Sequence, residues 1–135
     1  MAAKYEVLAE IRNLRGRLPH VTGVLVATVD GLLVAHETHD IEPDTLAAMS
    51  AAQLGLGQQI ARETALGGYL ETVTRSEGGY LAVFATGASA LLTVIADTEL
   101  NLGRLHHEAR PVAKRIGGLL AVPAEHRLPP RMTGR

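Results

Sequence analysis

The stretch Val21–Glu37, VTGVLVATVDGLLVAHE, constrains the fold more than any other part of the sequence. It contains two apolar runs, at 24–29 and 32–35, that are rich in β-branched and aliphatic residues. Asp30-Gly31 lies between them, and this pair tolerates the positive φ values of a type I′ turn. Both runs are apolar at nearly every position, which is typical of strands covered on both faces. The sequence therefore predicts a β-hairpin in a sheet that carries helices on each side.

Composition narrows the class of protein. A chain of 135 residues is long enough for one domain with a substantial core, and aromatic residues make up only 3%, so the core must be aliphatic. Few aromatic residues argue against a base-stacking surface, and a net charge of −1 provides no field that attracts DNA or acidic lipid. The absence of cysteine excludes disulfides, thiolate metal sites and thiol catalysis.

The N-terminus also bears on localisation. Charges interrupt the apolar residues of MAAKYEVLAEIRNLRGR, which is not the pattern of a signal peptide. No run reaches the roughly 18 apolar residues that a membrane span requires. We therefore expect a soluble, cytoplasmic protein.

Periodicity and turn residues predict the remaining elements. Residues 4–18 form an amphipathic helix that ends at Pro19. A long helix begins at Pro43-Asp44 and runs to about Ala65, and Gly67-Gly68 end it. Three strands joined by short turns follow, the first of them half-exposed and edge-like: residues 69–75, 80–85 and 89–96. A last helix begins near Thr98, its N-cap, and is kinked at Pro111. This order predicts an α+β domain over residues 1–120 with a five-stranded antiparallel sheet, followed by a flexible tail at 121–135.

The long helix has an unusual surface. It carries no charge from Thr45 to Ala61 and keeps Gly55 and Gly57, each about 1 kcal/mol less favourable than alanine in a helix interior. One stripe at helical spacing contains Leu46, Met49, Gln53, Leu56, Gly57, Ile60 and Thr64. A helix of this kind is covered on more than one side: by its own sheet and by a second copy of itself, or, alternatively, by other parts of a monomer.

The order of elements, with particular residues, resembles the Roadblock/dynein light chain family in its bacterial branch. The matching pieces are the helix and hairpin LRGRLPHVTGVLVATVDGLLVA, the helix LAAMSAAQLGLGQQIA, and the region from LETVTRSEGGYLAVFATGASALLTVIADTELNLGRL onward. They span about residues 5–120, and Pro111 in the closing helix departs from the family pattern. The resemblance implies a roadblock/profilin-like sheet, with the long helix on one face and the N- and C-terminal helices on the other.

The resemblance also implies a homodimer with antiparallel central helices and third strands paired edge to edge. The interface residues carried over are Met49, Gln53, Leu56, Gly57, Ile60, Leu70, Thr72 and Thr74. Similar bacterial proteins bind small Ras-like GTPases of the gliding-motility type, and some act beside a sensor kinase. The resemblance thus implies a regulatory or adaptor protein that modulates a GTPase, or, alternatively, a dimeric scaffold that links a sensor kinase or other partner without changing GTP hydrolysis.

The sequence contains no motif for catalysis or cofactor binding. The chain has no P-loop and no nucleophile elbow, so we expect no enzyme and no cofactor. His36 and His39 have a spacing that suits a metal but lack further ligands, so we expect no metal site. Arg62 and Arg75 are candidates for an arginine finger, against the simpler interpretation of surface charges. A small-ligand sensor or enzyme is a further alternative, although few polar groups converge in the sequence.

Overall fold

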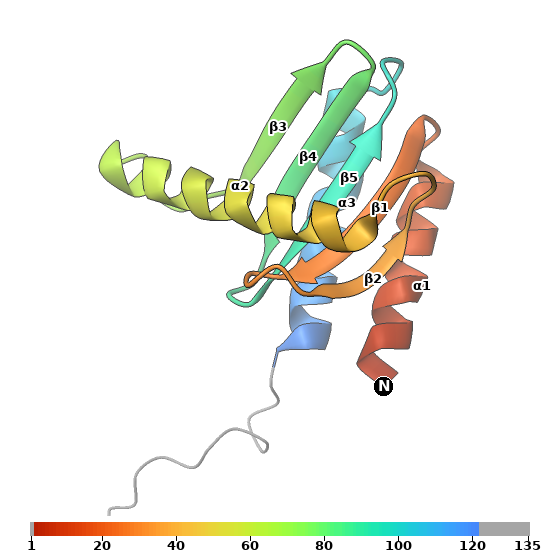
Figure 1. Ribbon diagram of the computed structural model, residues 1–135, viewed down its shortest axis with the longest axis horizontal. Helices are drawn as coiled ribbons and strands as arrows, with labels where there is room; N and C mark the ends of the chain where they lie inside the picture. The colour runs from red at the N-terminus through yellow and green to blue at the C-terminus, as the bar shows by residue number, and fades with distance from the viewer. Residues whose placement is uncertain (1, 122–135) are drawn as a thin grey trace, which may run out of the picture.

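Helices cover both faces of one antiparallel sheet in the computed structural model, which describes residues 2–121 (Figure 1). The elements, in chain order, are α1 (Ala2–Arg17), β1 (Val21–Thr28), β2 (Leu33–Glu37), α2 (Pro43–Glu63), β3 (Glu71–Ser76), β4 (Gly79–Thr86), β5 (Ala90–Ala96) and α3 (Leu102–Leu120). The strands lie in the order β2-β1-β5-β4-β3, and every neighbouring pair is antiparallel. The predicted α+β class, element order and five-stranded sheet are confirmed.

Alternate residues of β1 belong to two cores on opposite faces of the sheet. Val24 and Val26 pack with α1 and α3, whereas Leu25 and Ala27 pack with α2. This explains why the strand is apolar at consecutive positions. β2 is only half-buried because it forms one edge of the sheet, so the prediction of two fully covered strands holds for β1 alone. No helix within residues 2–121 is both long and apolar enough to cross a membrane.

The connection between β1 and β2 is not the predicted type I′ turn. Four residues, 29–32, separate the strands, and only Gly31 has a positive φ, of 90°. A type I′ turn needs positive φ at both central residues, and Asp30 does not adopt it. The longer loop has its own hydrogen bonds, because the Val29 amide donates to the Ser89 carbonyl and the Leu32 amide donates to the Thr28 hydroxyl.

Two helix ends also differ from the prediction. The amides of Ala65 and Leu66 donate to the carbonyls of Arg62 and Ala61, so a Schellman motif ends α2 at Glu63, before Gly67-Gly68. Ala65 takes the left-handed conformation that glycine usually occupies there. α3 begins later than predicted, because the side chain of Asn101, not Thr98, accepts from the Arg104 amide. α3 continues through Pro111 to Leu120, and the predicted tail, apart from Ala121, lies outside the described residues.

Tyr69, which lies two residues before β3, holds α2 against β3. Its hydroxyl donates to the Val83 carbonyl at 3.1 Å and shares a 2.6 Å hydrogen bond with the Thr72 hydroxyl. The ring lies against Gly57, where a Cβ atom would overlap it and would also lie 3.1 Å from the Thr72 oxygen. Gly57 is therefore required by packing within one chain, and the helix-to-helix approach that its presence suggested stays a prediction.

Burial raises the pKa of the Tyr69 hydroxyl above its usual value of 10.0. The charge of the neighbouring Glu71 adds to this increase, whereas the hydrogen bond with Thr72 opposes it. The folded chain therefore keeps this proton at a pH where the unfolded chain loses it. The resulting stability is complete below the ordinary pKa and is lost as the pH rises through the raised value.

Replacing Gly57 with alanine should destabilise the fold, because the new Cβ overlaps the Tyr69 ring, which must then shift and weaken its hydrogen bonds to Thr72 and Val83. We expect a loss of about 1–3 kcal/mol in the free energy of unfolding, measured with urea. Gly55→Ala is the matched control. Nothing lies within 4 Å of a Cβ at that position, so the higher helix propensity of alanine should stabilise by about 0.5–1 kcal/mol. Equal effects of the two changes would contradict the assigned role of Gly57.

Removing the Tyr69 hydroxyl should change the alkaline limb of the stability profile. At neutral pH, Tyr69→Phe should lower the free energy of unfolding by about 1 kcal/mol because two hydrogen bonds are lost. Between about pH 9 and pH 11 the parent should lose stability more steeply than the variant, which cannot ionise at this position. Tyr5→Phe, at an exposed tyrosine, is the control and should leave the slope unchanged. Parallel slopes for parent and Tyr69→Phe would refute this linkage.

Candidate protein-interaction surface

One flank of α2 is apolar and faces outward. Met49, Leu56 and Ile60 lie on this flank, and each side chain is more than half exposed. The opposite, inward side of the helix packs on the sheet through Leu46, Ala47, Ser50 and Leu54. Exposed apolar side chains that recur at helical spacing mark an interaction surface more often than scattered ones do. We call the three outward residues the α2 flank.

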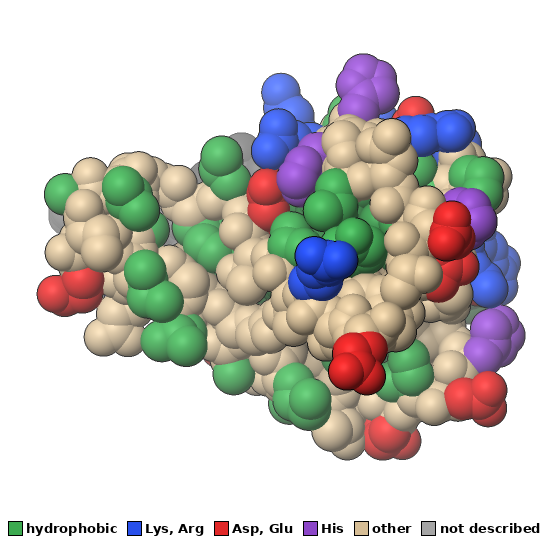
Figure 2. All heavy atoms as spheres, turned by 90° about the horizontal axis from the view of Figure 1, so that it is seen from above, with side chains coloured by type: hydrophobic (Ala, Val, Ile, Leu, Met, Phe, Trp, Pro, Cys, Tyr) green, Lys and Arg blue, Asp and Glu red, His purple; other side chains and the backbone are tan. Residues whose placement is uncertain are grey.

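The C-terminal end of α2 extends beyond the edge of its own sheet (Figure 1). Gln53 marks where the helix passes over the edge strand, because its side-chain amide donates to the Thr74 hydroxyl of β3 at 3.1 Å. Figure 2 shows this projecting end on the left, where hydrophobic side chains lie among other uncharged ones and acidic atoms lie at the tip. Leu66, just past the helix, is 76% exposed. The overhang therefore presents apolar surface with no sheet of its own chain beneath it.

β3 forms the open edge of the sheet next to the overhang. It pairs with β4 on one side only, and its burial falls from half-buried at Glu71 and Thr72 to exposed from Val73 onward. Leu70, immediately before the strand, is 70% exposed. Unpaired edge strands are templates for pairing with another chain. The α2 flank, the overhang and this edge adjoin one another.

The other edge of the sheet is protected by charge. Glu37 at the end of β2 accepts a hydrogen bond from the Arg12 side chain of α1 at 2.6 Å, and the Arg15 guanidinium lies 3.6 Å from its other oxygen. The hydrogen bond with Arg12 holds the pKa of Glu37 below its usual value, against the smaller effect of desolvation. Charged side chains at an edge discourage strand pairing. β3 also carries charged residues, Glu71 and Arg75, but it adjoins the apolar α2 flank, so it is the edge better suited to association.

The predicted interface residues divide into two groups. Four are exposed and free to contact another chain: Met49, Leu56, Ile60 and Leu70. The other four already have roles within the chain, since Gln53 bonds to Thr74, and Gly57 and Thr72 contact Tyr69. The Oε1 atom of Gln53 is nevertheless buried and has no hydrogen-bond partner among residues 2–121. Sequence reasoning missed Leu66 and Tyr69; the signal for Leu66 was a large apolar residue next to Gly67-Gly68.

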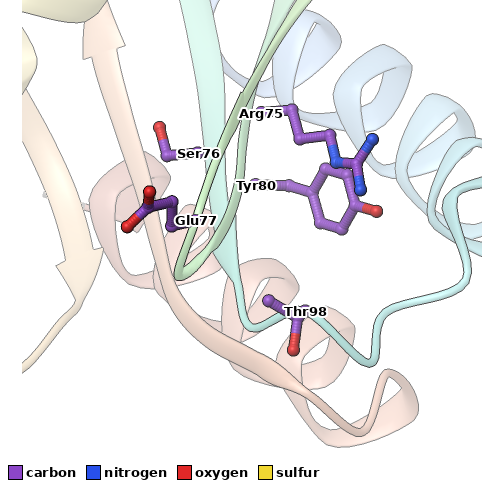
Figure 3. Close-up of a pocket in the computed structure, with 5 residues that line it drawn as sticks. All are labelled: Arg75, Ser76, Glu77, Tyr80 and Thr98. Atoms are coloured by element: carbon purple, nitrogen blue, oxygen red, sulfur yellow. The ribbon is translucent and has the colours of Figure 1, made fainter.

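A hollow of about 440 Å³ lies beside the β3–β4 turn (Figure 3). The side chains of Arg75 and Tyr80 lie on one side of the hairpin, whereas Ser76 and Glu77 lie on the other. The polar groups therefore do not converge on one point, as they do in a small-molecule site. This geometry gives no support to the alternative of a ligand sensor or enzyme.

The histidines do not gather into a metal site in the described part of the chain. The Nδ1 atom of His36 is hydrogen-bonded to the Thr38 hydroxyl at 2.9 Å, and residues 2–121 contain no cluster of three potential ligands. His106 instead approaches Glu71 of β3, with 3.2 Å between Nε2 and the carboxylate, and Arg110 lies 3.4 Å from the same group. Both residues belong to α3, so this contact connects α3 to the edge strand.

Comparison with solved structures finds the same fold in several bacterial proteins. A structure described as MglB with tetrameric arrangement has a TM-score of 0.79 and 21% identity, over 88% of this chain and 90% of that chain. A Roadblock/LC7 domain from Streptomyces avermitilis has a TM-score of 0.74 and 24% identity, over 85% and 95%. The gliding protein MglB from Thermus thermophilus has a TM-score of 0.69 and 24% identity, over 87% and 88%.

Sequence comparison gives the family. No protein with a curated description matches the chain. The Roadblock/LC7 domain matches residues 7–96, which extend from the first buried residue of α1 to the last residue of β5. This match covers all five strands and α2, and it agrees with the resemblance inferred from the order of elements. The chain belongs to the Roadblock/LC7 domain family.

Proposed function

We propose that this protein is a homodimeric regulator that binds a small Ras-like GTPase and modulates its nucleotide cycle in a bacterial signalling system. The observation that carries the proposal is the apolar α2 flank beside the open edge of β3. In a family member, a surface of this kind fits a second copy of the chain and, once dimeric, a partner protein. The exposed apolar residues and the open strand edge support the formation of a dimer, and family membership supports the binding of a partner protein.

The dimer places two α2 helices side by side and antiparallel, with the two β3 strands paired edge to edge. The overhang of α2 then lies above the partner's sheet, which supplies an apolar cover that residues 2–121 of its own chain do not supply. Met49, Leu56, Ile60 and Leu70 are buried in this arrangement, and Gln53, Gly57, Thr72 and Thr74 lie close to the symmetry axis. Burial of exposed aliphatic side chains is the main driving force for such an association.

The GTPase assignment depends on the bacterial branch of the family that the chain resembles. Solved structures with the same fold include a protein described as a gliding protein. The present chain has no P-loop, so it supplies a surface and not a nucleotide site. Binding to the switch segments of a GTPase changes its nucleotide cycle by favouring one of their conformations. We therefore propose a regulator without catalytic residues of its own.

Leu56→Glu should dissociate the dimer. A twofold interface contains the substitution twice, so two uncompensated charges would be buried and the dissociation constant should rise by about a hundredfold or more. Light scattering should give twice the chain mass of 14.3 kDa for the parent and 14.3 kDa for the variant. Gly55→Glu is the control, because it adds the same charge one residue away on the opposite flank. A dimeric Leu56→Glu variant would show that the α2 flank is not the interface.

GTPase binding should depend on the nucleotide. Immobilised protein is incubated with native lysate containing GDP or a non-hydrolysable GTP analogue, and retained proteins are identified by mass spectrometry. We expect a small Ras-like GTPase that is retained with the analogue and largely lost with GDP. Its turnover rate is then measured with and without the purified protein.

The other outcomes separate the alternatives. A GTPase retained equally in both states, with an unchanged hydrolysis rate, would favour the scaffold. Recovery of a sensor kinase alone, or of no partner, would contradict the GTPase assignment while leaving the dimer to be judged by light scattering. Beads that carry Leu56→Glu show whether partner binding requires the dimer.

A further inference from the structure

The open edge of β3 presents its backbone groups at alternate residues. The two-residue turn Glu77-Gly78 joins β3 to β4, and Ser76 pairs with Gly79 where the turn begins. The pair that flanks such a turn is hydrogen-bonded, and hydrogen-bonded pairs alternate with non-bonded pairs along an antiparallel ladder. Thr74 and Thr72 therefore direct their N–H and C=O groups toward β4. Three residues direct theirs away from the sheet: Glu71, Val73 and Arg75.

The same alternation divides the side chains between the two faces. Thr72 and Thr74 lie on the α2 side, where they contact Tyr69 and Gln53. Glu71 lies on the α3 side, next to His106 and Arg110. Arg75 shares the side of Glu71, because an even number of residues separates them, and Figure 3 shows it beside Tyr80. The three residues with free backbone groups thus share one face.

Symmetry limits how two copies of β3 can pair. A twofold axis perpendicular to the sheet leaves each face on its own side, so a residue opposes only residues of the same face. With the axis at Val73, that residue opposes its own copy and Glu71 opposes Arg75 of the partner subunit. Each of the three outward residues then pairs with a residue that lies within β3 of the second copy. With the axis at Thr74, Glu71 would oppose Glu77 of the partner subunit. That residue lies beyond the end of β3 and carries the same charge as Glu71.

The charges of the edge favour the first of these registers. No acidic side chain among residues 2–121 lies within 4.0 Å of Arg75. Glu71 keeps 15% of its side chain exposed and lies 3.2 Å from His106 and 3.4 Å from Arg110. A carboxylate can accept several hydrogen bonds, so it has room for one more guanidinium. Opposite charges that face each other across two strands are stabilising, and like charges are destabilising.

We propose that two copies of the chain pair through β3 in a single register centred on Val73, in which Glu71 faces Arg75 of the partner subunit on both sides of the axis. This inference rests on the homodimer proposed above and adds the residues that fix its alignment. Arg75, which was considered as an arginine finger, then acts in self-association. The register also places Thr72 opposite Thr74 of the partner subunit on the α2 side.

Disulfide trapping tests the register directly, because the chain contains no cysteine. In Val73→Cys the two new thiols oppose each other with Cα atoms about 5.5 Å apart, which suits a disulfide. In Thr74→Cys each thiol opposes Thr72 of the partner subunit, and the two Cα atoms are about 8 Å apart, too far for a disulfide. Mild oxidation of dilute protein should therefore cross-link Val73→Cys almost completely and leave Thr74→Cys unlinked on a non-reducing gel.

Each other outcome has a defined meaning when light scattering is run in parallel. Cross-linking of Thr74→Cys alone would place the axis at Thr74 and overturn the register. Equal cross-linking of both variants would indicate random collision and overturn it too. Dimeric protein in which neither variant cross-links would refute the register centred on Val73 while the homodimer stands. Monomeric parent protein would refute the homodimer itself.

Charge reversal provides an independent test. Arg75→Glu should weaken the dimer about tenfold, because it puts two carboxylates opposite each other on both sides of the axis. Lys4→Glu is the matched control: it causes the same change in net charge, Lys4 lies on α1, which packs on β1, β2 and α3, and Lys4 makes no ion pair within residues 2–121. The control should change the dissociation constant little, and high salt should reduce the difference between the variants. Equal weakening by both would refute the proposed pairing of Arg75.

Discussion

The sheet is apolar on both faces, and the rest of the structure depends on covering it. α1 and α3 together cover one face, while α2 alone crosses the other. Its 21 residues give a helix about 31 Å long, which continues past β3. A single helix laid across a sheet leaves its outer flanks uncovered. The exposed α2 flank and the open edge of β3 therefore have the same cause: residues 2–121 contain no further helix or strand that covers them.

The sequence predicted the elements well because their periodicities are strong and agree with one another. Consecutive apolar residues in β1 reflected burial on both faces. The stripe in α2 reflected its position on the sheet only at Leu46, since Met49, Leu56 and Ile60 of the same stripe face outward. The ends of the helices were harder to predict, since several residues compete to end a helix. Ala65 completes a Schellman motif although glycines follow two residues later, and Asn101 caps α3 in place of Thr98. Which of several candidate residues ends or caps a helix depends on local backbone geometry that the amino-acid composition does not reveal.

The candidate surface was predicted only in part. The lack of charge between Thr45 and Ala61 indicated a second contact for α2, and the structure places Met49, Leu56 and Ile60 outward. The two glycines of α2 look alike in the sequence, yet Gly57 accommodates Tyr69 and Gly55 contacts nothing. Tyr69 lies beyond the end of the helix, so no periodic pattern connects it to Gly57. Contacts between separate elements are the part of the site that sequence alone cannot supply.

The attachment of α2 to β3 has a kinetic consequence. Gln53 and Ser50 of α2 hydrogen-bond to Thr74 of β3 and Thr93 of β5. The ring of Tyr69, whose hydroxyl bonds to Thr72 and the Val83 carbonyl, packs against Gly57. These contacts hold the α2 flank and the strand edge in a fixed relative position, so we expect little rearrangement on association. A surface that needs no rearrangement loses little conformational entropy on binding and docks at ordinary diffusive rates. In the proposed dimer, the lifetime of the pair, and not its rate of formation, is then the quantity that substitutions at this surface change.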